Sequence, residues 1–307
     1  MGIKKVLVFV LMITIILGLS VLAFSAEQKV IGVTLMTREH VFFNLLEEAM
    51  QKRADEFGYK LIVMDSNFDL NKQLGQIDDF IVQEVDAVII SPAATGGLEP
   101  SIKKLAQAKI PVVTNNIKIN SNDPIIISQI GTDNYGGGYL AGEYAAEKVL
   151  NKKGKVCVIT YAEIQETLDR ERGFKDAVSK YQDIEVLDTQ NYAGSAEKAQ
   201  QLTQDMLVKF PEIDLIFTVG DPAVIGGIAA VKAAGRNVKF IGFDGNPEAI
   251  EAIKEGGMWI ADVSQHPEQM GTFTIDALNA FWSGQPYPSI IKIPTSIIDK
   301  ESLEKSN

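Results

Sequence analysis

The sequence contains few of the residues on which catalytic and metal chemistry most often depends. Its 307 residues include one cysteine and two histidines, Cys157, His40 and His266. One cysteine cannot form a disulfide within the chain. The HExxH pattern, a GxSxG nucleophile elbow and a cysteine beside a base are also absent. Cys157 stands between Val156 and Val158, and we expect it to be a small filler of the core.

Positive charge is scarce as well. Lysine and arginine total 29 against 40 aspartates and glutamates, the net charge is −11, and no run of basic residues occurs. Binding to nucleic acid needs such residues to neutralise phosphates, so we expect no nucleic-acid partner. The 46% hydrophobic and 22% charged content is typical of a folded protein, and the length favours two domains over one.

Signals for cofactors and metals are weak. No P-loop occurs, and the glycine run at residues 136–138 follows Thr132 and Asp133 rather than a strand, which favours a capped helix that packs closely. Residues 65–71 alternate oxygen-bearing side chains as a calcium loop does, but Leu70 replaces the turn glycine and Gln76 the final glutamate. Capping of the next helix is the other interpretation of that segment. We predict no metal and no cofactor.

The N-terminus resembles an export signal. Two lysines, Lys4 and Lys5, precede an apolar run from Val6 to Phe24, and small residues follow. We predict a signal peptide over residues 1–25 and a periplasmic or extracytoplasmic location. The alternative is an uncleaved anchor, because 19 apolar residues nearly span a bilayer; both place the remainder outside the cytoplasm.

What the sequence does have is an internal repetition. VDAVIISPAATGG and IPVVTNN flank a helical stretch in the first half, and IDLIFTVGDPAVIGG and VKFIGFDGN do so in the second. Continuous Val/Ile strands that alternate with helices indicate parallel sheets covered on both faces. We predict an α/β fold of two doubly wound parallel-sheet lobes, with helices over residues 41–57, 70–83, 98–108, 135–151, 168–181, 195–209, 222–234 and 267–283.

The late segments complete both lobes in this prediction. The chain would cross between them near residues 117–132, 263–266 and 292–296. The first lobe would comprise residues 26–131 plus 266–293, and the second 132–265 plus 294–307.

Ligands of such sheets bind beyond the carboxyl ends of the strands. The polar residues expected there are His40, Asn115, Asn116, Asp221 and Asp244. A polyol site also needs aromatic rings against C–H faces and charged hydrogen-bonding groups. Candidates are Phe42 and Phe43 after the first strand, Arg170 near a predicted helix start, where it would oppose the helix dipole, and Gln265 at a predicted crossing.

Together these segments resemble the ribose-type family of periplasmic sugar-binding proteins. The resemblance is carried by IGVTLMTREHVFF, EFGYKLIVMDSN, KIPVVTNN, IGTDNYGGGYLAGEY, DRERGF, IGFDGNPEAI and SQHPEQMG, in this order. It implies two lobes joined by three hinge strands that close over a sugar. Its sugar contacts would be His40, Phe42, Phe43, Asn116, Arg170, Asp244 and Gln265.

The sequence departs from the ribose pattern in four places. Met36 replaces a small hydroxyl residue, Asn116 and Ile117 replace an Asp-Arg pair, Gly220 replaces an asparagine, and Gly194 replaces an aromatic residue. Asp221 is then the polar group nearest Gly220. A less hydroxylated or partly apolar ligand is therefore an alternative to ribose.

We accordingly predict a monomeric receptor for a monosaccharide or polyol that hands its ligand to an ABC permease in the inner membrane, and not an enzyme. One alternative is a carbohydrate-acting enzyme that uses Asp221 and Asp244 across the cleft. Another is a sugar-binding partner of a chemoreceptor. A transcriptional regulator would need a DNA-binding segment where the signal stands.

Overall fold

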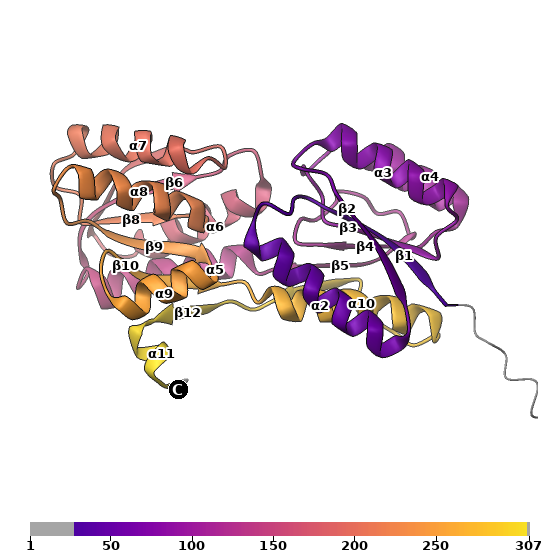
Figure 1. Ribbon diagram of the computed structural model, residues 1–307. Helices are drawn as coiled ribbons and strands as arrows, with labels where there is room; N and C mark the ends of the chain where they lie inside the picture. Colours follow the sequence, from indigo (N-terminus) through magenta and orange to yellow (C-terminus); the bar gives the residue numbers. More distant parts are fainter. Residues whose placement is uncertain (1–27, 306–307) are drawn as a thin grey trace, which may run out of the picture.

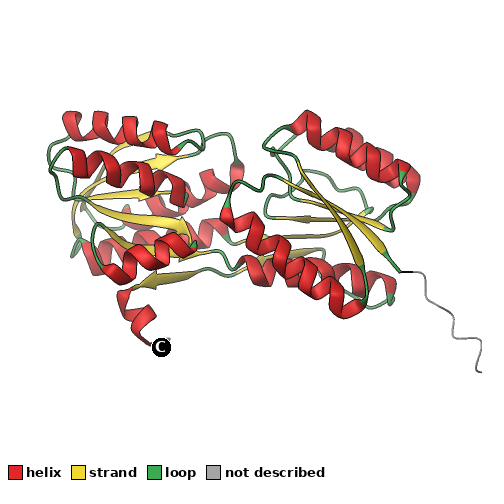
Figure 2. Cartoon of the chain, in the orientation of Figure 1, coloured by secondary structure: helices red, strands yellow, loops and turns green. Residues whose placement is uncertain are grey.

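The computed structural model describes residues 28–305, so the predicted signal peptide lies outside the described residues. Two lobes lie side by side, each built on one six-stranded sheet (Figure 1). Helices cover both faces of each sheet (Figure 2). The predicted fold class, two α/β lobes with largely parallel sheets, is confirmed.

The first sheet is wholly parallel, in the order β11-β5-β4-β3-β1-β2. Its strands are β1 (Val30–Leu35), β2 (Lys60–Asp65), β3 (Ala87–Ile90), β4 (Val112–Asn115), β5 (Ile126–Thr132) and β11 (Ile290–Ile293). On one face lie α3 (Leu70–Val82) and α4 (Glu99–Ala108), and on the other lie α2 (Val41–Phe57) and α10 (Pro267–Trp282) (Figure 1). Gly271 of α10 sits against the backbone of α2, so these two helices pack closely.

The second sheet has the order β12-β10-β9-β8-β6-β7, and only β12 runs antiparallel to its neighbour. Its strands are β6 (Lys153–Thr160), β7 (Asp183–Asn191), β8 (Leu215–Thr218), β9 (Lys239–Asp244), β10 (Trp259–Ser264) and β12 (Ser296–Asp299). Its helices are α5 (Asn134–Tyr144) with the π-helix η1 (Ala145–Val149), α6 (Gln165–Val178), α7 (Ala196–Lys209), α8 (Asp221–Ala233), α9 (Pro247–Glu255) and α11 (Lys300–Lys305).

The chain passes between the sheets three times. It does so after β5, after β10 and between β11 and β12. The last two passages fall within the predicted segments 263–266 and 292–296, whereas the first lies just after the predicted segment 117–132, because residues 126–132 form strand β5 of the first sheet. In both sheets these strands form one edge, so the connections gather on one side of the molecule. The predicted residue boundaries of the two domains stay a prediction.

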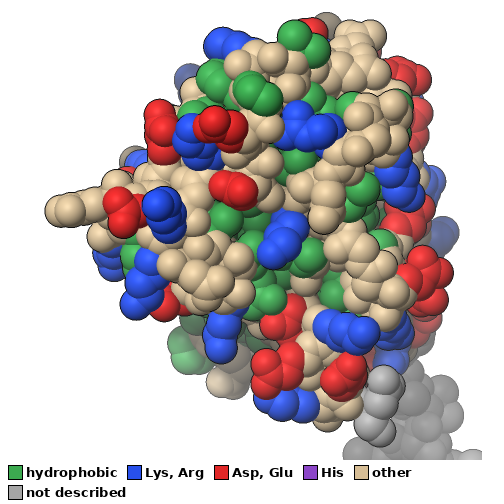
Figure 3. Space-filling view, turned by 90° about the vertical axis from the view of Figure 1, so that its left-hand side faces the viewer, with side chains coloured by type: hydrophobic (Ala, Val, Ile, Leu, Met, Phe, Trp, Pro, Cys, Tyr) green, Lys and Arg blue, Asp and Glu red, His purple; other side chains and the backbone are tan. Residues whose placement is uncertain are grey.

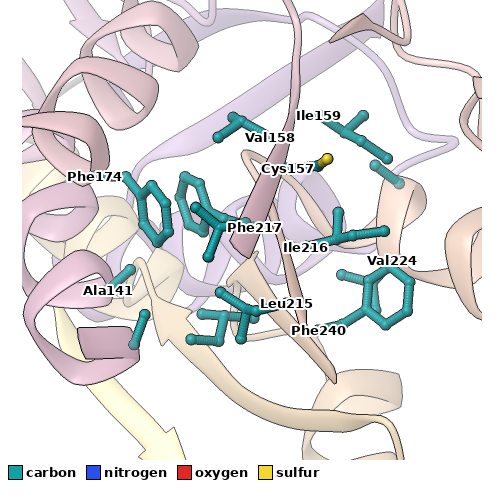
Figure 4. Close-up of a cluster of buried hydrophobic side chains, with 14 of the residues drawn as sticks. Ala141, Cys157, Val158, Ile159, Phe174, Leu215, Ile216, Phe217, Val224 and Phe240 are labelled. Carbon is teal, nitrogen blue, oxygen red and sulfur yellow. The ribbon is translucent and has the colours of Figure 1, made fainter. Parts of the chain in front are cut away.

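The core of the second lobe contains the single cysteine (Figure 4). Cys157 is fully buried, and burial raises the pKa of its thiol to about 12, so it stays a protonated, apolar filler as predicted. Phe174 of α6 stacks on Phe217 of β8 with 4.2 Å between ring centroids. This stack fixes α6 on the sheet.

Helix α6 begins three residues earlier than predicted, at Gln165 rather than 168. Ile164 occupies the cap position without a side-chain hydrogen bond, so the usual Ser, Thr, Asp or Asn signal for a helix start is missing. As a consequence Arg170 is the sixth residue of the helix. The prediction that it opposes the helix dipole at the N-terminus is therefore wrong.

The surface carries charges of both signs. On the end face of the second lobe, lysine and arginine side chains alternate with aspartate and glutamate around small apolar areas (Figure 3). Within residues 28–305, no helix has the length and apolarity needed to cross a membrane.

Candidate functional site

A cavity of about 100 Å³ lies between the lobes, at the carboxyl ends of the strands. The predicted site residues on its wall are His40, Phe42, Phe43, Asn116, Arg170, Asp244 and Gln265. They come from α2 and its preceding loop, from the end of β4, from α6, from the end of β9 and from the β10–α10 connection. The structure thus brings seven of the eight predicted residues together.

Asp244 is the centre of the polar part of this wall. Its Oδ1 accepts hydrogen bonds from Nη1 of Arg170, at 3.1 Å, and from Nε2 of Gln265. Its Oδ2 lies 3.3 Å from Nε2 of His40, which belongs to the other lobe. Burial by itself raises the pKa of Asp244, but the bonds from His40 and Arg170 outweigh burial and the net pKa is lowered. The carboxylate is therefore held ionised.

The backbone of Asp244 is held at φ 136°, which non-glycine residues rarely adopt. Such strain persists only where the surroundings over-determine it, and it concentrates at functional sites. The strand end is thus shaped to aim this carboxylate into the cavity.

Arg170 is buried, and contacts within the second lobe hold its guanidinium in place. Its Nε donates to Oδ1 of Asn134 and its Nη1 to the carbonyl of Val219, both at 2.8 Å, and its guanidinium lies 3.9 Å from the Phe243 ring centroid. Burial lowers its pKa, although Asp244 opposes this shift. These contacts fix the plane of the guanidinium beside the cavity.

His40 has two roles at once. Its Nδ1 accepts the backbone N–H of Phe42 and so caps α2, while Nε2 faces Asp244. A neutral imidazole protonated on Nε2 satisfies both contacts. The rings of Phe42 and Phe43 follow directly and meet edge to face, with centroids 5.1 Å apart. Both rings also belong to the core of the first lobe.

Gln265 and Asn116 occupy positions next to the hinge. Gln265 lies between β10 and α10, and its Oε1 accepts the hydroxyl hydrogen of Thr132 at the end of β5. This bond ties two of the three connections together. Asn116 follows β4 with φ 65°, a left-handed conformation that asparagine tolerates. Its neighbour Asn115 is buried and bonds Thr274 of α10, so Asn115 is structural.

Asp221 is the exception, because it is not among the residues that line the cavity. It is the first residue of α8, its Oδ2 accepts the backbone N–H of Asn246, and its Oδ1 is buried without a hydrogen-bond partner. Its carboxyl faces that of Asp262 on β10, and burial together with Asp262 raises its pKa. The two acids form a pair behind the wall, and we do not retain Asp221 as a ligand contact.

Several wall residues were not singled out as contacts from the sequence. They are Met36, Phe68, Ile117, Tyr161, Ile164, Glu166, Thr167, Tyr192, Gly194, Val219, Gly220 and Pro222. Tyr161 and Tyr192 follow β6 and β7, so the strand-end signal was available for both. Their rings meet at 67° with centroids 5.7 Å apart. Tyr192 thus supplies an aromatic wall two residues before Gly194, the position at which this chain lacks the aromatic residue of the ribose pattern.

The two weak motifs have structural roles. Asp69 caps α3 through the N–H groups of Asn71 and Lys72, and Asp65 accepts the N–H of Asn67. Asp133 caps α5 through Gly136. Across residues 28–305, no group of three or more histidine, cysteine or acidic side chains is arranged to hold a metal ion.

Comparison with known proteins identifies the family. A family model described as "Periplasmic binding protein domain" matches residues 31–286. This chain belongs to that family. The resemblance to periplasmic sugar-binding proteins is thereby confirmed.

Relatives in the periplasmic binding protein family carry sugar names. The chain is 29% identical over 286 residues to the ribose import binding protein of Haemophilus influenzae, covering 93% of this chain and 97% of that relative. It is 30% identical over 277 residues to the D-ribose/D-allose-binding protein of Pseudomonas aeruginosa, covering 85% and 84%. These similar proteins are named for binding or import and not for catalysis.

Solved structures of the family superpose closely. A solute-binding protein of an ABC transporter from Actinobacillus succinogenes with bound D-allose has a TM-score of 0.84, at 26% identity, covering 91% of this chain and all of that one. One from Agrobacterium vitis with bound α-D-tagatopyranose has a TM-score of 0.83, at 26% identity, covering 90% and 96%.

Proposed function

We propose that this protein captures a monosaccharide or related polyol between its lobes and delivers it to an ABC permease. The observation that carries this proposal is the cluster of Arg170, Asp244 and Gln265, held rigidly against a cavity that aromatic rings also line. Hydroxyl groups can donate to the carboxylate and accept from the guanidinium and amide, while rings pack on C–H faces. No step of bond cleavage is needed for this use of the site.

The energies fit a receptor that binds and releases. Each hydrogen bond to a charged group contributes about 1.5–3 kcal/mol. Roughly three to six such bonds supply the roughly 8 kcal/mol of micromolar binding, and packing against the rings helps to offset the ordering costs. Family membership and the sugar names of the relatives support the same function and an extracytoplasmic location.

The arrangement of the wall suggests which ligands to test first. In the second sheet the polar groups Asp244 and Gln265 lie toward the hinge edge, on β9 and after β10. Phe68, Tyr161 and Tyr192 lie after β2, β6 and β7, toward the opposite edge. A ligand with hydroxyl groups at one end and a less polar face at the other matches this gradient, and so we propose deoxysugars beside ribose and allose.

The test is a thermal-shift screen of pentoses, hexoses, deoxysugars and polyols on the protein without residues 1–25, followed by calorimetry. We expect at least one sugar to bind with a micromolar or lower Kd and to be recovered unchanged. Recovery of a cleaved or isomerised sugar would favour the enzyme alternative. No binding across the panel would refute the proposal.

A further inference from the structure

Glu166 is a cavity residue with one satisfied oxygen and one unsatisfied oxygen. It is the second residue of α6, in the second lobe, and its Oε1 accepts the backbone N–H of Lys118, in the first lobe, at 2.9 Å. Its Oε2 is buried and has no hydrogen-bond partner among residues 28–305. The side chain therefore bridges the lobes with one oxygen and leaves the other free.

A purely structural role explains the bonded oxygen Oε1 of Glu166 but not the unbonded oxygen Oε2. An acid in the first turn of a helix is favourable because it complements the helix dipole. Burial raises the pKa of Glu166, although the backbone N–H groups of Lys118 and of Glu166 itself lower it. A buried acceptor without a donor is unfavourable by an amount comparable to a lost hydrogen bond, so Oε2 needs a donor from elsewhere.

The cavities around Glu166 indicate where that donor comes from. Glu166, Asn116 and Ile117 line the site cavity and also a second cavity of about 360 Å³ beside the hinge. The second cavity includes Gln129 and Thr132 on its wall. Glu166 thus lies where the two cavities adjoin, and a ligand bound in the site cavity lies beside its side chain.

We propose that Glu166 couples ligand binding to lobe closure: Oε2 accepts a hydroxyl hydrogen of the bound sugar while Oε1 holds the Lys118 amide of the opposite lobe. This inference rests on the proposed function. It makes Glu166 a specificity residue for ligands that present a free hydroxyl at this point. A ligand with that hydroxyl removed or methylated loses the contact.

The decisive variant is Glu166→Gln. The amide oxygen can keep the bond from Lys118, but the group facing the ligand becomes an NH₂ that donates instead of accepting. We expect calorimetry to show that the Kd for the sugar with the largest thermal shift rises at least tenfold. At saturation with that sugar, the radius of gyration should decrease by as much as it does in the wild type. Glu166→Ala should lose both the affinity and part of the closure.

Glu171→Gln is the matched control, because Glu171 lies on the same helix and pairs with Lys175 away from the cavity. It should bind like the wild type. A Glu166→Gln variant that melts normally and binds within twofold of the wild type would overturn the inference. If no sugar binds the wild type, the proposed function fails instead. The contact between Glu166 and Lys118 is then tested by small-angle scattering without ligand, in which Glu166→Ala, but not Glu166→Gln, should increase the radius of gyration.

Discussion

At the scale of single residues, Asp244 organises the site because three side chains from separate elements converge on it. Arg170 comes from α6, Gln265 from the hinge and His40 from the other lobe. A carboxylate with this many donors is already oriented before a ligand arrives. Preorganisation of this kind increases affinity because less order has to be created on binding.

Arg170→Lys tests that preorganisation. Lysine keeps a positive charge near Asp244 but cannot reproduce the planar set of bonds to Asn134, Val219 and Asp244. We expect the Kd to rise at least tenfold, about 1.4 kcal/mol, as calorimetry would show. Arg172→Lys is the control, since Arg172 is exposed on the same helix and pairs with Asp169; equal effects of the two variants would contradict the assignment.

The acid pair behind the wall predicts how stability depends on pH. Burial raises the pKa of Asp262 to about 7, and the pKa of Asp221 is also raised above 3.8. Between about pH 4 and 7 the folded protein thus holds protons that the unfolded chain has released. Because the folded state binds more protons there, the free energy of unfolding falls as pH rises through this window.

Asp221→Asn should reduce this dependence. The amide nitrogen can donate permanently to Asp262 while the amide oxygen still accepts the N–H of Asn246. We expect the variant to be more stable than the wild type by roughly 1–3 kcal/mol at pH 8, the range for pairing a buried polar atom. Thermal denaturation from pH 4.5 to 8.5 measures this. Parallel curves for the two proteins would show that the Asp221–Asp262 pair does not cause the pH dependence, and altered sugar affinity would return Asp221 to the ligand contacts.

The sequence predicted the wall residues well where a side chain lies at the carboxyl end of a strand: Asn116 follows β4, and Asp244 is the last residue of β9. It failed for Asp221 because that residue starts α8, and only the fold shows that its carboxyl turns back to Asp262 on a distant strand. Glu166 was missed for a related reason. Its significance depends on Lys118 in the other lobe, and no local pattern connects the two.

At the scale of elements, the packing of α5 on α6 positions Arg170. Gly138 of α5 lies so close to α6 that a Cβ would be 2.0 Å from the backbone oxygen of Arg170, and a Cβ on Gly173 of α6 would be 2.2 Å from the backbone oxygen of Tyr135. The glycines therefore permit backbone contact between the two helices. The prediction that the glycine run lets this helix pack closely on the sheet holds for Gly137, which faces Phe243 of β9, whereas Gly138 packs on a helix instead. The expectation that the run does not follow a strand was wrong, because β5 ends at Thr132.

Gly138→Ala should consequently move α6 and affect binding as well as stability. We expect a loss of roughly 1–3 kcal/mol, typical of overpacking, and a weaker affinity because Arg170 shifts. Gly75→Ala on α3 is the control: a Cβ there meets nothing within 4 Å, and alanine should stabilise the helix by roughly 0.5–1 kcal/mol. Denaturant unfolding and calorimetry on both variants measure these effects.

Periodicity predicted the long helices α2, α3 and α7 almost to the residue, since each has an apolar stripe and a clear start. It did not anticipate η1, which continues α5 with a wider turn, or the early start of α6 without a capping side chain. The last two crossings were predictable because late strands had to complete two sheets, whereas the first was placed too early because β5 was not recognised as a strand of the first sheet.

At the scale of the whole molecule, closure depends on contacts that span the lobes. His40 with Asp244 and Lys118 with Glu166 are two such contacts, and Thr95 with the N–H of Gln165 is a third. Each of them joins the two lobes directly. A sugar shifts the equilibrium toward closure only by the extra affinity that it has for the closed form.

His40→Asn separates the two functions of His40 and tests its part in closure. Asparagine is among the best helix caps, so the bond to the N–H of Phe42 should survive and the melting temperature should change little. Its short side chain cannot reach Asp244 as the imidazole does, so the ligand-free protein should favour the open form.

We expect a larger radius of gyration without sugar, a normal one at saturation, and a higher Kd, because binding must now supply the free energy of closure. Small-angle scattering with and without sugar measures this. An unchanged ligand-free radius would show that the remaining contacts alone hold the lobes together, and that the His40–Asp244 pair serves recognition rather than closure.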